Sequence, residues 1–313
     1  MVLLLQYTLI FASVLILVAL GGCFAEHSGV INLGLEGIMI MGALGGALAM
    51  RYISPNVPAI VMILGVLAIS ALVGMIYSCL LAVACINFKA DQTLVGTALN
   101  LLGTAGATVI VKAINTAANP DDVSSIVQYA GAKKAFTVNL GSFEFSWFML
   151  VTALLLAASY VLLYKTRFGL RLMACGEHPQ AADSVGINVY KMRYIGVLIS
   201  GVLGGIGGMA YIIPSVSSWN FEVGVSGAGF LALAVMIFGQ WKPFRIFLAA
   251  VFFALFKSLA NIASSIPFLA DLGWTQNMYN MIPFIASMII LAFTSKKSRA
   301  PKAEGIPYDK GSR

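Results

Sequence analysis

Residues 3–22, LLLQYTLIFASVLILVALGG, carry no charged side chain and are long enough to cross a lipid bilayer as one helix. No basic region precedes this stretch and no small-residue cleavage site follows it, so we interpret it as a spanning helix rather than a signal peptide. The rest of the chain is similar. Of 313 residues, 60% are hydrophobic and 10% are charged, and the mean hydropathy is +0.92. Because a soluble domain is about 25% charged, this chain needs lipid as its solvent.

Further apolar segments of spanning length follow the first one. Together they predict a single all-α transmembrane domain over residues 1–294, built as a polytopic bundle of eight or nine spans. The count depends on the segment 226–240, which is short for a straight span and is typical of a broken or re-entrant helix. Residues 295–313 form a polar C-terminal tail. The predicted segments are 3–22, 30–50, 59–84, 93–113, 147–164, 194–213, 226–240, 246–263 and 278–294.

The positions of the lysine and arginine residues predict the orientation of the bundle. If nine segments cross and the C-terminus is cytoplasmic, 14 Lys and Arg residues lie inside, and four lie outside: Arg51, Lys112, Lys133 and Lys134. Cytoplasmic loops carry such an excess of positive charge. We therefore expect a multi-pass membrane protein with the loop 165–193 and the C-terminus in the cytoplasm. The same bias explains the net charge of +7, so a nucleic-acid partner is not expected.

Small residues gather in several of the predicted helices. Gly42 and Gly46 form one GxxxG pair, and the segment 194–213 holds overlapping pairs made by Gly201, Gly204, Gly205, Gly207 and Gly208. Such residues let helix backbones approach closely in lipid, so we expect a tightly packed bundle. The stretches SGVINLGLEGIMIMGAL, from Ser28, and SGAGFLALAVMIFGQW, from Ser226, resemble each other weakly and would run in opposite directions. This suggests the hypothesis of an inverted repeat.

The loop 165–193 contains a short helix signal. Pro179 stands where a helix would begin, good helix formers follow it, and Gly186 is a typical stop. The resulting helix would be too polar to insert and too short to form a domain. We interpret it as a docking surface for a cytoplasmic partner.

Here the sequence resembles a known family. Gln180 to Gly186, QAADSVG, is similar to the EAAxxxG motif on the coupling helix of ABC importer permeases, although Gln180 replaces its Glu. The surrounding run FGLRLMACGEHPQAADSVGINV resembles the branch that serves simple sugars, nucleosides and branched-chain amino acids. Residues 25–37, 238–243 and 305–310 are similar to the nucleoside-type permeases of that branch. The resemblance covers essentially the whole chain, in the right order.

This resemblance implies a permease subunit that forms half of a translocation pathway for nucleosides. Its partners would be a separate ABC ATPase subunit, a second permease subunit that is homologous but distinct, and an extracytoplasmic solute-binding lipoprotein. It also implies which residues couple the permease to the ATPase. These are Glu177, Pro179, Gln180, Ala181, Ala182, Asp183 and Gly186.

Three polar residues inside predicted spans are candidates for the solute pathway. Asn32 and Glu36 share one helix face, and Asn100 lies in mid-span beside Thr97 and Thr104. Intramembrane polar groups usually face the bundle interior, a partner or a water-filled pathway. A hydrogen bond between helices is the alternative for each of them. Lys257, also inside a span, would pair with a carboxylate or extend toward an interface.

Catalytic and metal-binding motifs are missing from the sequence. It has no P-loop, HExxH or GxSxG motif, and its four cysteines do not have metal-ligand spacing. Glu26 and His27 are more typical of a helix-end contact than of a catalytic or metal pair. We therefore expect no cofactor and no enzymatic activity, with ATP hydrolysed by another chain. The alternatives are a permease for a simple sugar or a branched-chain amino acid, and an ion-coupled secondary transporter that uses Glu36 and Lys257.

Overall fold

The computed structural model describes residues 2–54, 57–129, 134–141, 143–214, 217–263, 274–294 and 299–311. Within these residues, six helical segments are long and apolar enough to cross a membrane. They are α1 (Val2–His27), α3 (Ala59–Ala82) with the π-helical turn η1 (Val83–Asn87), α4 (Gln92–Ala118), α6 (Trp147–Lys165), α9 (Val189–Ile212) and α11 (Pro243–Ile262). The other helices are α2 (Leu35–Tyr52), α7 (Arg167–Glu177), α8 (Pro179–Ser184), the 3-10 turn η2 (Phe221–Val223), α10 (Ala228–Phe238) and α13 (Gln276–Thr294).

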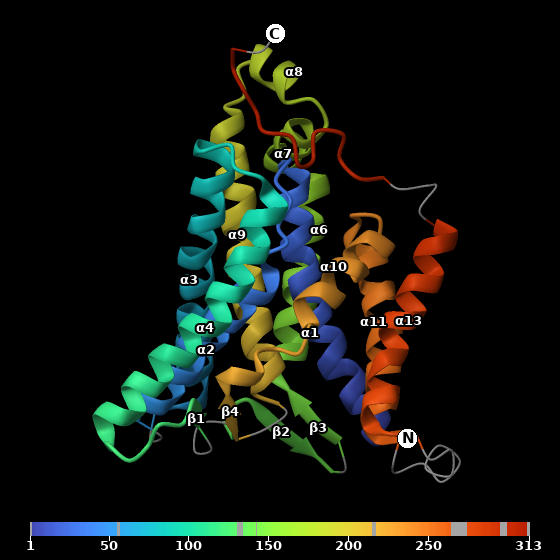
Figure 1. Cartoon of the computed structure of the whole chain (residues 1–313). Coiled ribbons are helices and arrows are strands. Elements are labelled where there is room, and N and C mark those ends of the chain that lie inside the picture. The colour runs from blue at the N-terminus through green and yellow to red at the C-terminus, as the bar shows by residue number, and fades with distance from the viewer. Residues whose placement is uncertain are drawn as a thin grey trace.

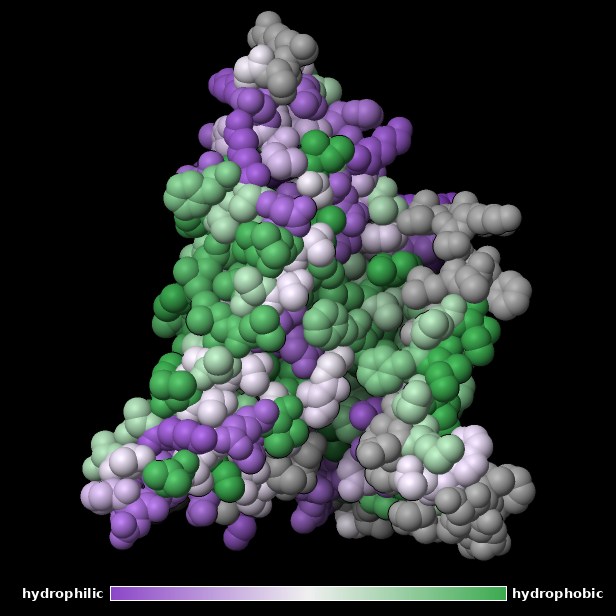
Figure 2. All heavy atoms as spheres, in the orientation of Figure 1, coloured by the Kyte–Doolittle hydropathy of each residue, from purple (hydrophilic) through white to green (hydrophobic). Residues whose placement is uncertain are grey.

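The long helices form one bundle whose two ends differ (Figure 1). One end carries α7, α8 and the C-terminus, and we call it the α8 end. The other carries the N-terminus and two antiparallel strand pairs, and we call it the hairpin end. There β1 (Ile126–Gln128) pairs with β4 (Ser218–Asn220), and β2 (Thr137–Leu140) pairs with β3 (Phe143–Ser146). Figure 2 shows an apolar band between hydrophilic ends, as a membrane protein requires.

Helices α1 and α9 occupy the middle of the bundle. In their most apolar windows, 67% of α1 residues and 72% of α9 residues are buried inside the protein, against 28% for the α3 segment and 22% for α6. Helix α1 packs against α6, α9, α10 and α11. Because α3 and α6 are equally apolar but exposed, they are the helices that lipid would cover.

The predicted close packing of small residues is confirmed where α2, α3 and α9 meet. A Cβ on Gly42 would lie 2.3 Å from the Cα of Gly205, and a Cβ on Gly205 would lie 2.4 Å from the carbonyl oxygen of Ser70. The Ser70 hydroxyl donates to the carbonyl oxygens of Gly42 and Gly205, at 2.9 and 2.7 Å. These glycines therefore let three backbones touch, which is the usual basis of helix association in lipid.

Two of the predicted segments begin as helices later than the sequence suggested. Segment 30–50 becomes helical only at Leu35, because the Asn32 side chain accepts a hydrogen bond from Gly34 N at 3.1 Å and closes a local turn. Segment 226–240 is helical only from Ala228 to Phe238, and the two residues before it, Ser226 and Gly227, have φ of 52° and 77°. Each segment is thus a non-helical stretch followed by a shortened helix.

Candidate functional site

The first turns of the two shortened helices meet inside the bundle at Glu36. This residue lies at the start of α2 and is 9% exposed. One carboxylate oxygen accepts a hydrogen bond from Gly227 N at 2.8 Å, and the other accepts from Gly229 N at 2.7 Å. Both donors belong to the N-terminus of α10, where a negative group is favourable. Glu36 therefore serves as a cap for α10, although it comes from another helix.

The other two predicted pathway residues surround the start of α2. Asn100 on α4 accepts from Gly37 N and donates to the carbonyl oxygen of Leu33, both at 2.8 Å. Asn32 donates to the hydroxyl of Ser200 on α9 at 2.8 Å. Asn32, Glu36 and Asn100 are all buried. The structure thus brings the three residues together. Each makes a hydrogen bond to another segment, which is the alternative to a role in the solute pathway.

A stripe of threonines runs along the outward face of α4. Thr93 and Thr97 are exposed, and Thr104 and Thr108 are half-buried on the same face. At the hairpin end of this face, Lys112 forms an ion pair with Glu222 at 2.6 Å. Figure 2 shows pale and hydrophilic residues interrupting the apolar band on the side where α4 and α10 lie in Figure 1. The hydroxyls of Thr97 and Thr104 donate to the carbonyl oxygens of Thr93 and Asn100 on the same helix, at 2.8 and 3.2 Å. Thr93 and Thr108 were missed from the sequence, although their spacing of three to four residues from Thr97 and Thr104 predicts one face.

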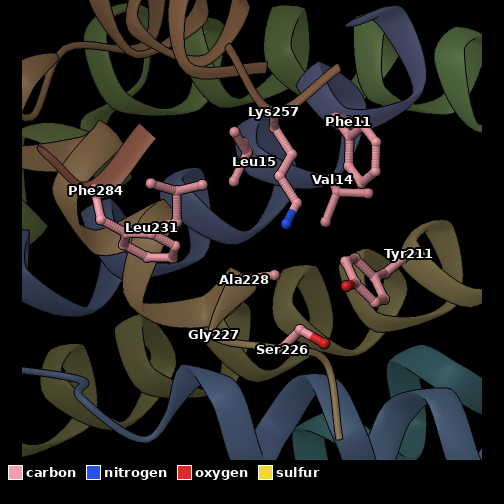
Figure 3. A pocket seen from close by; sticks show the side chains of 10 residues that line it. All are labelled: Phe11, Val14, Leu15, Tyr211, Ser226, Gly227, Ala228, Leu231, Lys257 and Phe284. Carbon is pink, nitrogen blue, oxygen red and sulfur yellow. The ribbon is translucent and has the colours of Figure 1, made fainter. Parts of the chain in front are cut away.

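Lys257 extends into a small cavity between α1, α9, α10, α11 and α13 (Figure 3). The hydroxyl groups of Tyr211 and Ser226 face the same cavity, and aromatic and aliphatic side chains form its other walls. The cavity volume is about 20 Å³, which holds one water molecule. Its lining residues are Phe11, Val14, Leu15, Tyr211, Ser226, Gly227, Ala228, Leu231, Lys257 and Phe284.

The predicted short helix is confirmed as α8, with Pro179 in its first turn. It ends where Gly186 adopts φ of +83°, and Asn188 then caps α9 by accepting from Lys191 N at 2.9 Å. Figure 1 shows α8 protruding beyond α7 at the tip of the molecule. The predicted coupling residues differ in how far they are exposed to solvent. Glu177, Gln180, Ala181 and Gly186 are exposed, Asp183 is half-buried, and Pro179 and Ala182 are buried.

Glu26 and His27 make a helix-end contact, as the sequence suggested. The Trp241 indole nitrogen donates to the Glu26 carboxylate, and the His27 ring bonds to the Trp241 carbonyl oxygen at 3.0 Å. Across the described part of the chain, no group of three or more His, Cys, Asp and Glu residues is placed to hold a metal ion.

Comparison with known proteins agrees with this architecture. Residues 4–292 match the family model described as "branched-chain amino acid transport system / permease component". The guanosine ABC transporter permease protein NupQ of Bacillus subtilis is 42% identical over 98% of this chain and 96% of its own length. The nucleoside ABC transporter permease protein NupC of Lactococcus lactis is 37% identical, over 96% and 95%. A putative glucose ABC transporter permease of Haloferax volcanii is 31% identical, over 86% and 80%. With a family match over almost all of its length, the chain belongs to the branched-chain amino acid transport system permease component family.

Proposed function

We propose that this chain is a transmembrane permease subunit of an ABC importer and forms half of a pathway for nucleosides. The observation that carries this proposal is its similarity, over nearly the full length of each chain, to a guanosine permease and a nucleoside permease. A sugar permease is the second candidate, because a putative glucose permease is also similar over most of its length.

In this proposal the energy for transport comes from a separate ATPase chain that docks on α8. The support is that α8 protrudes from one end of the bundle and exposes Gln180, Ala181 and Gly186. In the chain, α8 follows α6 and α7 and leads directly into α9. It is therefore joined to two long helices, α6 and α9. A displacement of α8 by the ATPase would therefore move the bundle, which is the basis of alternating access.

We propose that α2, α10 and α13 complete nine crossings, with the α8 end in the cytoplasm. Two observations support this. The described N- and C-terminal residues lie at opposite ends of the molecule, which needs an odd number of crossings. The helices also carry basic residues at the α8 end, including Lys165, Lys191 and Lys242. The two shortened helices, whose N-termini meet at Glu36, are the natural partners in an inverted repeat.

The proposed pathway runs along the threonine face of α4, against a second and homologous permease subunit. The support is the row of threonines on this face and the ion pair of Lys112 with Glu222 near its hairpin end. Asn32, Glu36 and Asn100 tie the start of α2 to α9, α10 and α4, respectively. A solute-binding lipoprotein would deliver nucleosides at the hairpin end.

Uptake by the assembled importer tests the proposed function. The chain is co-expressed with the ATPase, second permease and binding protein encoded beside it, and uptake of radiolabelled nucleosides is measured. Unlabelled purine and pyrimidine nucleosides are expected to compete, and glucose and leucine are not. Competition by glucose alone would favour the sugar permease. Failure of an ATPase to co-purify with the chain from detergent would contradict the ABC assignment.

Lys257→Met is expected to lower nucleoside uptake by roughly tenfold, because the variant loses a cation that faces Tyr211 and Ser226 in the cavity (Figure 3). A tenfold loss of uptake corresponds to about 1.4 kcal/mol of lost interaction. Lys257→Arg retains the charge and should keep most of the uptake. Equal uptake by Lys257→Met and the unmodified chain, at equal amounts in the membrane, would remove Lys257 from the transport mechanism.

A further inference from the structure

Residues 301–310, which turn at 302–305, form a strap across the α8 end, seen in red in Figure 1. Three contacts tie the strap to separate elements. Ala303 N donates to the carbonyl oxygen of Gly176 on α7 at 2.8 Å. Arg193 of α9 donates to the carbonyl oxygen of Ile306 at 3.0 Å. Lys89, in the loop before α4, forms an ion pair with Asp309 at 3.0 Å. The strap therefore links α7, α9 and the entry to α4.

Tyr308 anchors the strap beside α8. Its side chain is 4% exposed, and its ring lies 5.2 Å from the ring of Tyr190 on α9. The guanidinium of Arg193 lies 6.0 Å from the centre of the same ring, within the range of a cation–π contact. The charge of the Asp183 carboxyl on α8 acts on the Tyr308 hydroxyl. One buried ring thus packs on the start of α9 and lies beside α8.

Arg193 contacts the strap at two points, the carbonyl oxygen of Ile306 and the ring of Tyr308. Its side chain is only 1% exposed, and a buried cation is costly unless it is well paired. The carbonyl oxygen of Ile306 accepts from one of its three nitrogens, and within the described residues Nε and Nη2 have no hydrogen-bond partner. Without the strap, Arg193 would lose both this carbonyl and the Tyr308 ring.

The strap and α8 share one outer surface. Lys310 of the strap lies beside residues from α8 and the start of α9 in a groove of about 320 Å³. Val185 is 75% exposed and Ile306 is 57% exposed, although both lie at the hydrophilic end of the molecule. A partner protein that covered this end would remove both apolar side chains from water, which is favourable. The groove is lined by Asp183, Gly186, Ile187, Asn188, Val189, Tyr190 and Lys310.

We infer that the strap is a second part of the ATPase-docking surface, and that Tyr308 holds α8 in the position in which the ATPase binds it. This inference rests on the proposed function. Its partner is the ATPase chain, whose docking face would offer apolar contacts to Val185 and Ile306 and polar groups to Asp183 and Lys310. Because Asp309 also pairs with Lys89, the strap would pass movement of α8 to the loop before α4.

The strap is expected to detach more readily at pH 8 than at pH 5. Burial raises the pKa of the Glu304 carboxyl to about 7 from 4.5, so the bound strap keeps this group protonated while the released strap ionises it. Binding is therefore weakened as the pH rises from about 4.5 to about 7. The carboxyl of Glu26 on α1 lies close enough to Glu304 for the two groups to interact electrostatically. A spin label on Lys310→Cys reports mobility. Glu304→Gln should abolish the change, and equal mobility at both pH values in the unmodified strap would contradict the prediction.

Two substitutions of Tyr308 test the inference in the complete importer. Tyr308→Ala removes the buried ring, and Tyr308→Phe keeps the ring and removes only the hydroxyl, on which the Asp183 charge acts. Affinity of the permease complex for added ATPase is measured in lipid nanodiscs, together with nucleoside uptake. We expect Tyr308→Ala to weaken ATPase binding about tenfold, as when an anchoring aromatic residue is lost, and Tyr308→Phe to weaken it less.

The possible outcomes separate this inference from the proposed function. If the unmodified permease binds the ATPase and Tyr308→Ala binds it equally well, the inference about the strap is wrong and the proposed function stands. If the unmodified permease does not bind the ATPase, the proposed function fails first. A truncation after Lys302 gives a second test that removes Tyr308, Asp309 and Lys310 together. A truncation after Lys310 is its control and should bind normally.

Discussion

Glu36→Ala is expected to reduce nucleoside uptake at least a hundredfold and to lower the thermal stability of the purified permease. The substitution removes the acceptors of both Gly227 N and Gly229 N, which Glu36 binds at 2.8 and 2.7 Å. Leaving each buried N–H unpaired costs about 1–3 kcal/mol, or roughly 2–6 kcal/mol for the two. Water could not reach these groups easily inside an apolar bundle. The start of α10 would therefore move away from α2.

Two controls make this prediction specific. Glu36→Gln keeps the side-chain volume and one acceptor oxygen, so its uptake should lie between that of Glu36→Ala and that of the unmodified chain. Glu144→Ala removes a half-buried carboxylate at the hairpin end, whose bond from Gln6 is long at 3.3 Å, and it should change little. Uptake and melting temperature are measured in the same preparations. Normal uptake by Glu36→Ala would show that α10 is held by other contacts.

The apolar spans could be predicted from the sequence because lipid imposes a simple rule on them. Residues 3–22 have no alternative to a helix in a bilayer, since every backbone group must bond within its own segment. The short helix α8 could also be predicted, because Pro179 and Gly186 act locally on the backbone. Predictions of this kind depend on neighbours in the sequence.

The contacts that define the candidate site depend on residues far apart in the chain. Glu36 and Gly227 are separated by 191 positions, so no local pattern identifies the carboxylate as a cap for α10. The late start of α2 has a local cause in the turn at Asn32. From the sequence alone, however, an Asn inside an apolar segment could equally be a pathway residue, so this turn could not be predicted. The sequence marked the strap as a polar tail with a family-like stretch at 305–310, but it did not predict the contacts of Tyr308 with Tyr190 and Arg193.

Gly186→Val is expected to uncouple the ATPase from transport, with nucleoside-stimulated ATP hydrolysis and uptake both reduced at least tenfold. Gly186 has φ of +83° and its N–H closes α8 by donating to the carbonyl oxygen of Asp183 at 2.9 Å. A branched side chain in this conformation costs about 1–2 kcal/mol or more. A Cβ there would meet no atom within 4 Å, so the strain comes from the backbone and not from a clash. The chain would relieve it by turning the end of α8, which lies on the surface proposed to meet the ATPase.

Gly186→Asn separates the backbone effect from the simple presence of a side chain. Asn tolerates positive φ better than other non-glycine residues, so this variant should retain most of its coupling although it projects a larger group into the groove. Both variants are assembled with the ATPase in nanodiscs, and stimulated hydrolysis is compared with uptake in vesicles. If Gly186→Val hydrolyses ATP and transports nucleosides normally, α8 is not the coupling helix. If Gly186→Asn fails as completely as Gly186→Val, docking requires that position 186 carry no side chain, and backbone strain is not the main cause of the defect.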